Sequence, residues 1–218
     1  MLSQMLKAGQ ASSAPVEVEF IGHTSATFAR SSNFTVSYPA GTQDGDIAVI
    51  CIGASRGFGR DYTSAGWTVL NRTTGPDRAK AQLSYRVVSG TGNQTFSGDN
   101  PVDPSYILAV FRNTGYSAFS VSAEDGDDAG NILPNPPFRS GTFNAVLCFG
   151  VAGINDTTVT APTGYTLISA VGQGGGADFG ATTMAAYTIE DITNPNPSAF
   201  TNIDSTNDSA VAYTVGFA

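Results

Sequence analysis

Hydrophobic and polar residues alternate one by one along much of the chain from Val16 onward. Val16, Val18 and Phe20 alternate with glutamates, and the segments 34–38 and 82–87 have the same period of two. This period predicts β-strands with one buried face.

Two segments, 47–52 and 145–149, are apolar at every position. Such runs are typical of central strands that are covered on both faces. Clusters of Gly, Pro, Asp and Asn separate the apolar segments and predict turns. The whole pattern predicts about twelve short strands, and no segment after residue 15 has the period of a helix. We expect an all-β fold, as a β-sandwich or jelly roll.

The strand pattern of the first half returns in the second half. The matching segments are 46–53 with 144–150, 66–70 with 164–168, 83–87 with 185–189, and 106–111 with 210–215. The offset grows from 97 between Cys51 and Cys148 to 104 between Phe96 and Phe200, as expected if insertions fall in loops. Because the matching segments are apolar strands, this internal pseudo-repeat indicates architecture rather than chemistry. We expect the duplicated strands to be shared between two facing sheets.

Residues 1–15 differ in character from the rest of the chain. They contain four apolar residues at near-helical spacing: Met1, Leu2, Met5 and Leu6. An apolar stretch this short does not hold a helix alone, so we interpret 1–15 as an N-terminal arm that docks on a partner. Residues 16–218 are interpreted as a single β-sandwich domain. Its duplicated halves, about 16–121 and 140–218, are joined by a Pro-rich segment that is too short to be a free linker.

Composition narrows the classes of partner. The chain of 218 residues has a net charge of −8 and ten Lys and Arg in total, which argues against nucleic acid or an anionic membrane as partner. No apolar run is long enough to span a membrane, and the start lacks the apolar centre of a secretory signal, so we expect synthesis in a cytoplasm. Cys51 and Cys148 have apolar neighbours and are expected to be buried free thiols.

Residue types that carry catalysis are sparse. His23 is the single His, and no G-x-S-x-G turn or comparable nucleophile signature accompanies it. We therefore expect no enzymatic activity, no catalytic residue and no cofactor. An acidic turn around Gly126 offers the carboxylates of Glu124, Asp125, Asp127 and Asp128. The spacing of an EF-hand loop is absent, so we expect a solvated turn and no metal; if Ca²⁺ binds anywhere, it binds here.

One loop has the composition of a contact surface. Within 56–62 it combines guanidinium groups and aromatic rings, from Arg56, Phe58, Arg60 and Tyr62. This mixture suits a protein or glycan partner, whereas the matching loop 153–162 has neither Arg nor an aromatic residue. The alternative is a long structural loop with Phe58 packed inward. Trp67 and Tyr165 resemble a sugar-stacking pair, but each begins a duplicated strand after a Gly, which favours core packing.

Four elements follow one another in a recognisable order. They are Gly45-Asp46 before an apolar strand, Ala-Gly-Trp-Thr-Val-Leu at 65–70, Tyr-Arg-Val-Val at 85–88, and Phe-Arg-Asn-Thr-Gly at 111–115. In this order the chain resembles the β-sandwich modules of tailed-bacteriophage virion proteins, which occur in fibre, spike and decoration subunits. The likeness covers roughly 16–217 as a strand pattern. It departs from the pattern at Asn113, where an Arg-Gly pair would have Gly.

The resemblance implies a non-enzymatic structural protein of the virion, such as a capsid decoration, spike or tail-fibre component. Its expected partners are other virion proteins and further copies of itself in a homo-oligomer, and its expected location is the virion, after synthesis in the host cytoplasm. The arm would provide the attachment. The alternative is a carbohydrate-binding or host-receptor-binding β-sandwich module with a surface glycan as partner. A lectin should bind a glycan in isolation, whereas a decoration protein should need only its own kind and the particle.

Overall fold

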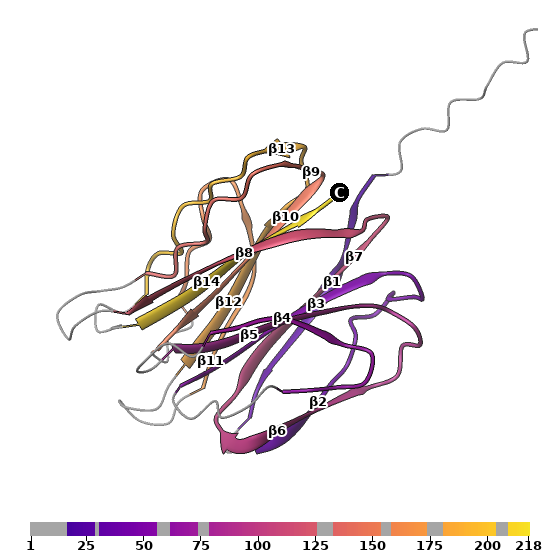
Figure 1. Ribbon diagram of the computed structural model, residues 1–218, viewed down its shortest axis with the longest axis vertical. Coiled ribbons are helices and arrows are strands. Elements are labelled where there is room, and N and C mark those ends of the chain that lie inside the picture. Colours follow the sequence, from indigo (N-terminus) through magenta and orange to yellow (C-terminus); the bar gives the residue numbers. More distant parts are fainter. Residues whose placement is uncertain are drawn as a thin grey trace, which may run out of the picture.

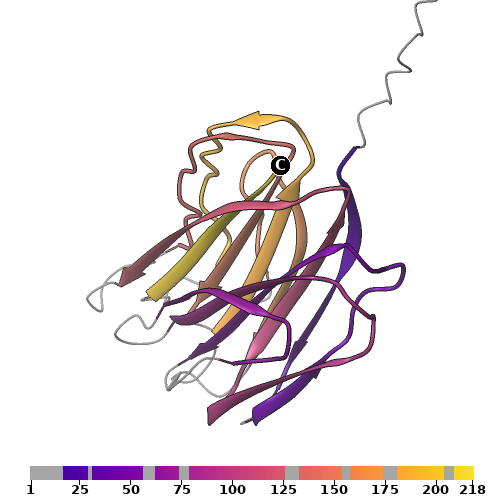
Figure 2. The ribbon, with the colours of Figure 1, turned by 45° about the vertical axis from the view of Figure 1, so that its right-hand side comes forward.

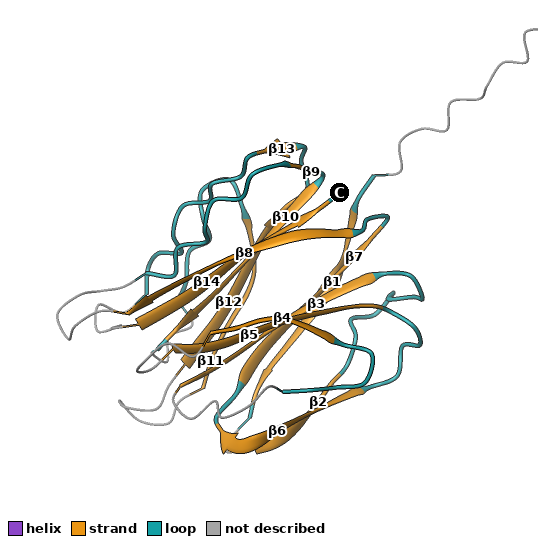
Figure 3. Ribbon diagram, in the orientation of Figure 1, coloured by secondary structure: helices purple, strands orange, loops and turns teal. Residues whose placement is uncertain are grey.

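The structure, a computed structural model, describes residues 17–28, 31–55, 62–73, 79–125, 133–153, 158–173, 181–203 and 209–218, with backbone only at 55, 99–102, 116–125 and 173. Within these residues the regular elements are fourteen β-strands and no helix (Figure 3). All strand pairs are antiparallel. The expectation of an all-β fold is confirmed.

Two five-stranded sheets form the body of the protein (Figure 1). The first sheet contains, in spatial order, β1 (Glu19–Thr27), β7 (Ser105–Arg112), β3 (Ile47–Ser55), β5 (Ala79–Val87) and β4 (Thr68–Thr73). The second contains β11 (Thr166–Gln173), β12 (Ala181–Thr188), β10 (Ala145–Ala152), β14 (Ser209–Phe217) and β8 (Tyr116–Asp125). Two smaller sheets pair β2 (Ser31–Val36) with β6 (Gln94–Val102), and β9 (Thr142–Phe143) with β13 (Ile192–Thr193).

The two large sheets face each other across a shared hydrophobic core, the central core (Figure 2). Because side chains alternate between the faces of a strand, β3 places Val49 and Cys51 in this core and Ile50 and Ile52 in a second core beneath β2 and β6. On β10 the outward side chains enter a third core beneath the segments that contain β9 and β13. The prediction that 47–52 and 145–149 are central strands covered on both faces is therefore confirmed.

Each half of the chain forms one large sheet. When β1 to β7 are matched in order with β8 to β14, the spatial order β1-β7-β3-β5-β4 becomes β8-β14-β10-β12-β11, which is the order of the second sheet. The outermost strands of both sheets are irregular at matching places: Ile21 and Ser117 on β1 and β8, and Leu70 and Ile168 on β4 and β11. The duplicated strands are thus divided between the sheets, with one copy in each.

The offset expected for the first matching segment is one residue too small. Val49 and Leu147 each pair with the matching tyrosine of the neighbouring strand, and they are 98 positions apart rather than 97. Cys51 therefore corresponds to Phe149 and not to Cys148. Since a shift of one residue moves a side chain to the other face of its sheet, Cys51 lies in the central core and Cys148 in the third core. Both cysteines are buried and free, as expected.

Some contacts between the two large sheets are reciprocal. β7 packs on β12, and β5 packs on β14, which is the same pair of strands with the halves exchanged. At one side of this interface the ring of Phe20 on β1 stacks on Tyr187 of β12, with centroids 4.3 Å apart. Contacts of this kind are expected of a two-fold relation between the halves, but the contacts of β11 with β1 and β7 have no counterpart of similar extent at β4, so the relation is incomplete.

Candidate functional site

One end of the two sheets holds both ends of the described chain (Figure 1). The Asn113 side-chain amide donates a hydrogen bond to the carbonyl oxygen of Glu17, at 3.1 Å. Gly115 and Ala218 exchange two backbone hydrogen bonds of 3.2 Å. Asn113 has a φ of 58°, in the left-handed region that Asn tolerates better than most residues other than Gly. This conformation explains why Asn can stand where the resemblance leads us to expect Gly.

A buried ion pair lies at the same end. The Asp46 side chain is 2% exposed, and its two carboxylate oxygens accept hydrogen bonds from Arg112 Nε and Nη2 at 2.9 and 3.0 Å. These hydrogen bonds raise the pKa of Arg112. The matching positions of the second half hold Asn144 and Ala218, so this pair is made once. Two elements that carry the resemblance, Gly-Asp and Arg-Asn, therefore meet in one structural contact.

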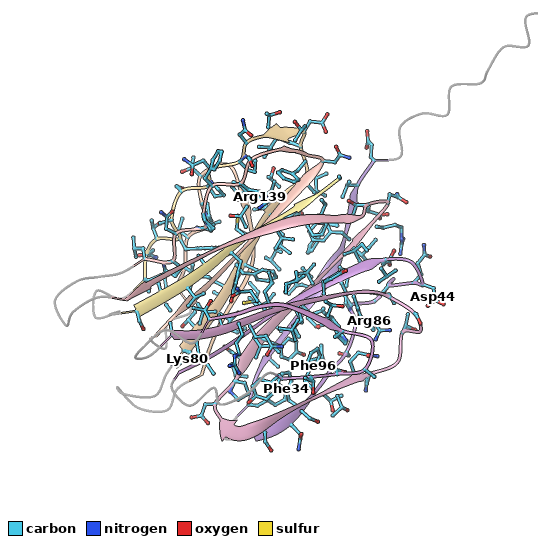
Figure 4. The ribbon with its side chains drawn as sticks, viewed as in Figure 1. Phe34, Asp44, Lys80, Arg86, Phe96 and Arg139 are labelled. Carbon is cyan, nitrogen blue, oxygen red and sulfur yellow. The ribbon has the colours of Figure 1, made fainter. Side chains whose placement is uncertain are left out.

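A second polar group, the Trp67–Arg86 cluster, is formed by Trp67, Arg86, Tyr38, Gln94 and Ser89 on the outer side of the first sheet. Figure 4 labels Arg86, and Phe96 of the same region. Trp67 follows Gly66, whose φ is 77°, and its half-buried ring packs on Phe96 with centroids 5.2 Å apart. The Arg86 guanidinium lies 5.9 Å from the centre of the Trp67 ring. Arg86 Nη1 donates to Gln94 Oε1 at 2.5 Å and Nη2 to the Ser89 carbonyl oxygen at 3.1 Å.

Hydrogen-bond donors in this cluster lack acceptors. The buried Trp67 Nε1 has no hydrogen-bond partner among the described residues, and no acceptor there takes the proton of the Tyr38 hydroxyl. Burial raises the pKa of Tyr38, and the charge of Arg86 and a hydrogen bond from its side chain partly offset that increase. Arg86 is 8% exposed, yet no carboxylate in the described part of the chain lies within ion-pair distance of it. The matching positions of Trp67 and Arg86 in the second half hold Tyr165 and Thr188.

The structure separates the residues that the sequence suggests as contact residues. Met1, Leu2, Met5 and Leu6 of the arm, and Arg56, Phe58 and Arg60 of the loop, lie outside the described residues. Tyr62 is described and is 2% exposed. Its ring meets Phe34 edge to face with centroids 5.1 Å apart, and its hydroxyl donates to the Ser31 carbonyl oxygen at 3.0 Å. Tyr62 is therefore a core residue, whereas a contact role of the other seven residues stays a prediction.

The remaining candidate sites show no organised chemistry where they are described. Glu124 and Asp125 end β8 and pair through their backbone with Ala210 and Ser209, and residues 126–128 lie outside the described residues. No group of three His, Cys, Asp or Glu side chains that could hold a metal ion occurs among the described residues. Partial burial lowers the pKa of His23 on β1. Helices long and apolar enough to cross a bilayer are absent from the described part of the chain.

Trp67 and Tyr165 occupy matching, partly buried positions. Trp67 packs in the second core and Tyr165 in the third, each after a Gly with positive φ. Burial raises the pKa of Tyr165. The preference for packing over paired sugar stacking agrees with these positions, although Arg86 and Tyr38 beside Trp67 were missed. The available signal was Arg86 itself, a charged residue where the repeat has Thr188.

Comparisons with protein-family models, with curated proteins and with solved structures find no match to this chain.

Proposed function

We propose that the chain is a β-sandwich with an internal pseudo-repeat and serves as a non-enzymatic structural protein of a bacteriophage particle. Its role would be that of a capsid decoration, spike or tail-fibre component that attaches through the N-terminal arm. The observation that carries this proposal is that the described chain begins and ends at one end of the sheets, whereas β3 finishes at the opposite end.

The described chain begins and ends at one end of the sheets. Glu17 is fixed there by Asn113, and Ala218 by Gly115. β3 starts at this end and finishes at Ser55, where its partner is Ala79, at the opposite end. A protein held through the residues before Glu17 therefore presents the Ser55 end away from its attachment point. An attached, projecting subunit needs this polarity.

Glycine and charged residues in the resembling elements support a likeness of fold. Gly45 and Gly66 have positive φ values of 93° and 77°, which side-chain-bearing residues rarely adopt. The ion pair between Asp46 and Arg112 joins the first and the fourth of the resembling elements. The elements that resemble phage modules are thus the residues that shape the strand connections.

Irregular edge strands favour the arm over sheet extension as the means of association. The four edge strands β1, β4, β8 and β11 all contain a pairing irregularity. Bulges twist an edge and hinder the addition of a strand from another chain. We therefore propose that copies assemble, and attach to other virion proteins, through the apolar residues of the arm.

The test replaces the apolar residues of the arm in the full chain with serine at Leu2, Met5 and Leu6. Its matched control carries three serines in the small-residue part of the arm, at Ala8, Ala11 and Ala14. We measure the oligomer mass by light scattering, the thermal midpoint, and the amount of protein in particles purified from cells that naturally express the gene. The first variant should lose incorporation at an unchanged thermal midpoint, and the control should retain both. Wild-type incorporation of the first variant would exclude attachment through the arm.

A specific observation favours the alternative of a carbohydrate-binding or receptor-binding module. The Trp67–Arg86 cluster occurs in one half only and has donors without acceptors. If the isolated wild-type chain bound a glycan and never entered particles, the alternative would replace the virion proposal.

A further inference from the structure

Two arginines of this protein, Arg112 and Arg86, differ in the charge of their hydrogen-bond partners. Arg112 is 23% exposed and is neutralised by the carboxylate of Asp46. Arg86 is more deeply buried, at 8% exposure, and it donates to neutral oxygens of Gln94, Ser89 and, at a long 3.5 Å, Val87. A buried charge is normally paired with an opposite charge. Within the described part of the chain, Arg86 thus lacks the carboxylate that its burial calls for.

Several hydrogen-bond donors around Arg86 have no acceptor among the described residues. A guanidinium has five N–H groups, of which three donate to Val87, Gln94 and Ser89, and the Arg86 side chain also contacts the Tyr38 hydroxyl. The Trp67 indole N–H and the proton of the Tyr38 hydroxyl have no acceptor among the described residues. Asp44, which could have supplied an acceptor, instead accepts a hydrogen bond from the Gly90 backbone N–H at 2.7 Å. The N–H groups of Arg86 and Trp67 can only donate, and the Tyr38 hydroxyl has a proton to donate, so the group as a whole suits an anionic ligand.

Glycine residues lie in the turns beside the Arg86 guanidinium. A Cβ added to Gly66 would lie 3.6 Å from Arg86 Cζ, in ordinary contact, so the glycine leaves that space beside the guanidinium free. A Cβ added to Gly90 or Gly92, next to Ser89 and Gln94, would meet no atom within 4 Å. These three residues are exposed. The turns beside Arg86 therefore border open space rather than another layer of the protein.

We propose that the Trp67–Arg86 cluster binds a sugar that carries a carboxylate, such as a uronic acid, at one site in each chain. The carboxylate accepts hydrogen bonds from the N–H groups of Arg86 that do not donate to Gln94, Ser89 or Val87, which suits the fork geometry of a guanidinium. The Trp67 and Tyr38 rings supply apolar surface for the sugar ring, and their donors reach its oxygens. The second half has Tyr165 and Thr188 at the matching positions and no equivalent site. This inference does not rest on the virion proposal.

Trp67 is the single tryptophan of the chain, so its fluorescence reports on the site directly. The wild-type chain is titrated with glucuronate, acetate and glucose at constant ionic strength. We expect a saturable change with glucuronate, at least tenfold weaker binding of acetate, and no change with glucose. Arg86→Lys keeps the charge but not the fork and should bind glucuronate at least tenfold more weakly. Arg139→Lys makes the same exchange in the other half and should bind normally.

Tyr38→Phe guards against a variant that fails to fold, because it removes one oxygen and keeps the ring. It should weaken glucuronate binding severalfold while the circular dichroism spectrum stays unchanged. Absence of a saturable change with glucuronate would overturn the proposal. Equal responses to glucose or to acetate would overturn it as well, since the first removes the role of the carboxylate and the second that of the sugar. Undiminished binding in both Arg86→Lys and Tyr38→Phe would move the site elsewhere.

Discussion

Asp46 is the most constrained carboxylate of the described chain. Its side chain accepts hydrogen bonds from the Arg112 guanidinium and from the Gln43 backbone N–H at 2.9 Å, and it is almost fully buried. Removal of a buried acceptor leaves its donors unsatisfied, which costs more than the hydrogen bonds contribute. The exposed Asn144 at the matching position has no such role.

We predict that Asp46→Ala lowers the free energy of unfolding by about 1–3 kcal/mol. Asn144→Ala, the matched control, should change it by less than about 0.5 kcal/mol. Urea denaturation followed by tryptophan fluorescence measures both. Equal effects of the two substitutions would show that the ion pair does not contribute to the free energy of unfolding.

Buried thiols and phenols predict a loss of stability in alkali. Burial raises the pKa of Cys51 and Cys148 well above the ordinary value of 9.0, and that of Tyr62 to about 12 from 10.0. Above the ordinary pKa the unfolded chain loses protons that the folded chain keeps. Stability is therefore complete below about pH 9 and falls as the pH rises through 9 toward 12.

The measurement is urea denaturation at a series of pH values from 7 to 11. We expect a constant free energy of unfolding up to about pH 8.5 and a steep decline above it. The double variant Cys51→Ala, Cys148→Ala should decline less steeply, because two of the titrating groups are gone. A profile that stays flat to pH 11 would contradict the burial of these groups.

At the scale of elements, the separation of the two large sheets depends on glycine at position 53 of β3. A Cβ there would come within 3.1 Å of both Val151 methyl carbons and would clash with the Thr183 hydroxyl of the facing sheet. That hydroxyl already shares a 2.7 Å hydrogen bond with Ser105. The sheets therefore meet too closely here for any side chain.

We predict that Gly53→Ala lowers the free energy of unfolding by about 1–3 kcal/mol through overpacking. Gly92→Ala serves as the control, since a Cβ at Gly92 meets no atom within 4 Å. Thermal unfolding distinguishes the two variants. If Gly53→Ala were as stable as Gly92→Ala, the facing sheets would have to be further apart than the structure places them.

The matching strands of the two halves were predictable from the sequence, but their register and spatial order were not. Apolar alternation is a local property, so the repeated segments identified the matching strands β3 and β10. The match of Cys51 with Cys148 used a shared residue type, whereas the face of a sheet depends on position counted along the strand. Pairing partners such as Val49 with Tyr85 fix that position, and they come from distant parts of the chain.

At the scale of the whole molecule, the central core belongs to both halves. Leu83 and Ile107 of the first half and Phe149 and Val215 of the second lie in the same cluster. Hydrogen bonds also cross between the sheets, from the Ala79 N–H to Ser209 Oγ at 2.8 Å and from the Tyr213 hydroxyl to the Ala81 carbonyl oxygen at 3.2 Å. Each sheet alone would expose one complete apolar face.

We predict that fragments 1–115 and 116–218 do not fold separately. Neither should unfold cooperatively alone, and mixing them should restore a cooperative transition, because each supplies the apolar face that the other needs. Circular dichroism with urea denaturation provides the measurement. Two soluble fragments that each unfold cooperatively would show two independent domains instead of one.

The Trp67–Arg86 cluster was less predictable than the fold, because it depends on how distant segments pack in the whole molecule. An Arg that alternates with apolar residues, as Arg86 does on β5, normally faces solvent. It is buried here because Gln94 of β6 and the Trp67 ring come from distant parts of the chain to cover it. Tyr38 could be identified as a strand residue, but its position beside Arg86 depends on the same tertiary packing.

A pair of separate, identical half-chains would have to display every surface feature twice. In this protein the covalent connection between β7 and β8 removes that requirement, so a change in one half leaves the other untouched. Both halves keep matching aromatics toward the central core, such as Phe111 and Phe217, while the Asp46–Arg112 pair and the Trp67–Arg86 cluster occur in one half. The repeated strand order therefore lets one half carry polar contacts that the other half lacks, while both halves keep the residues of the shared core.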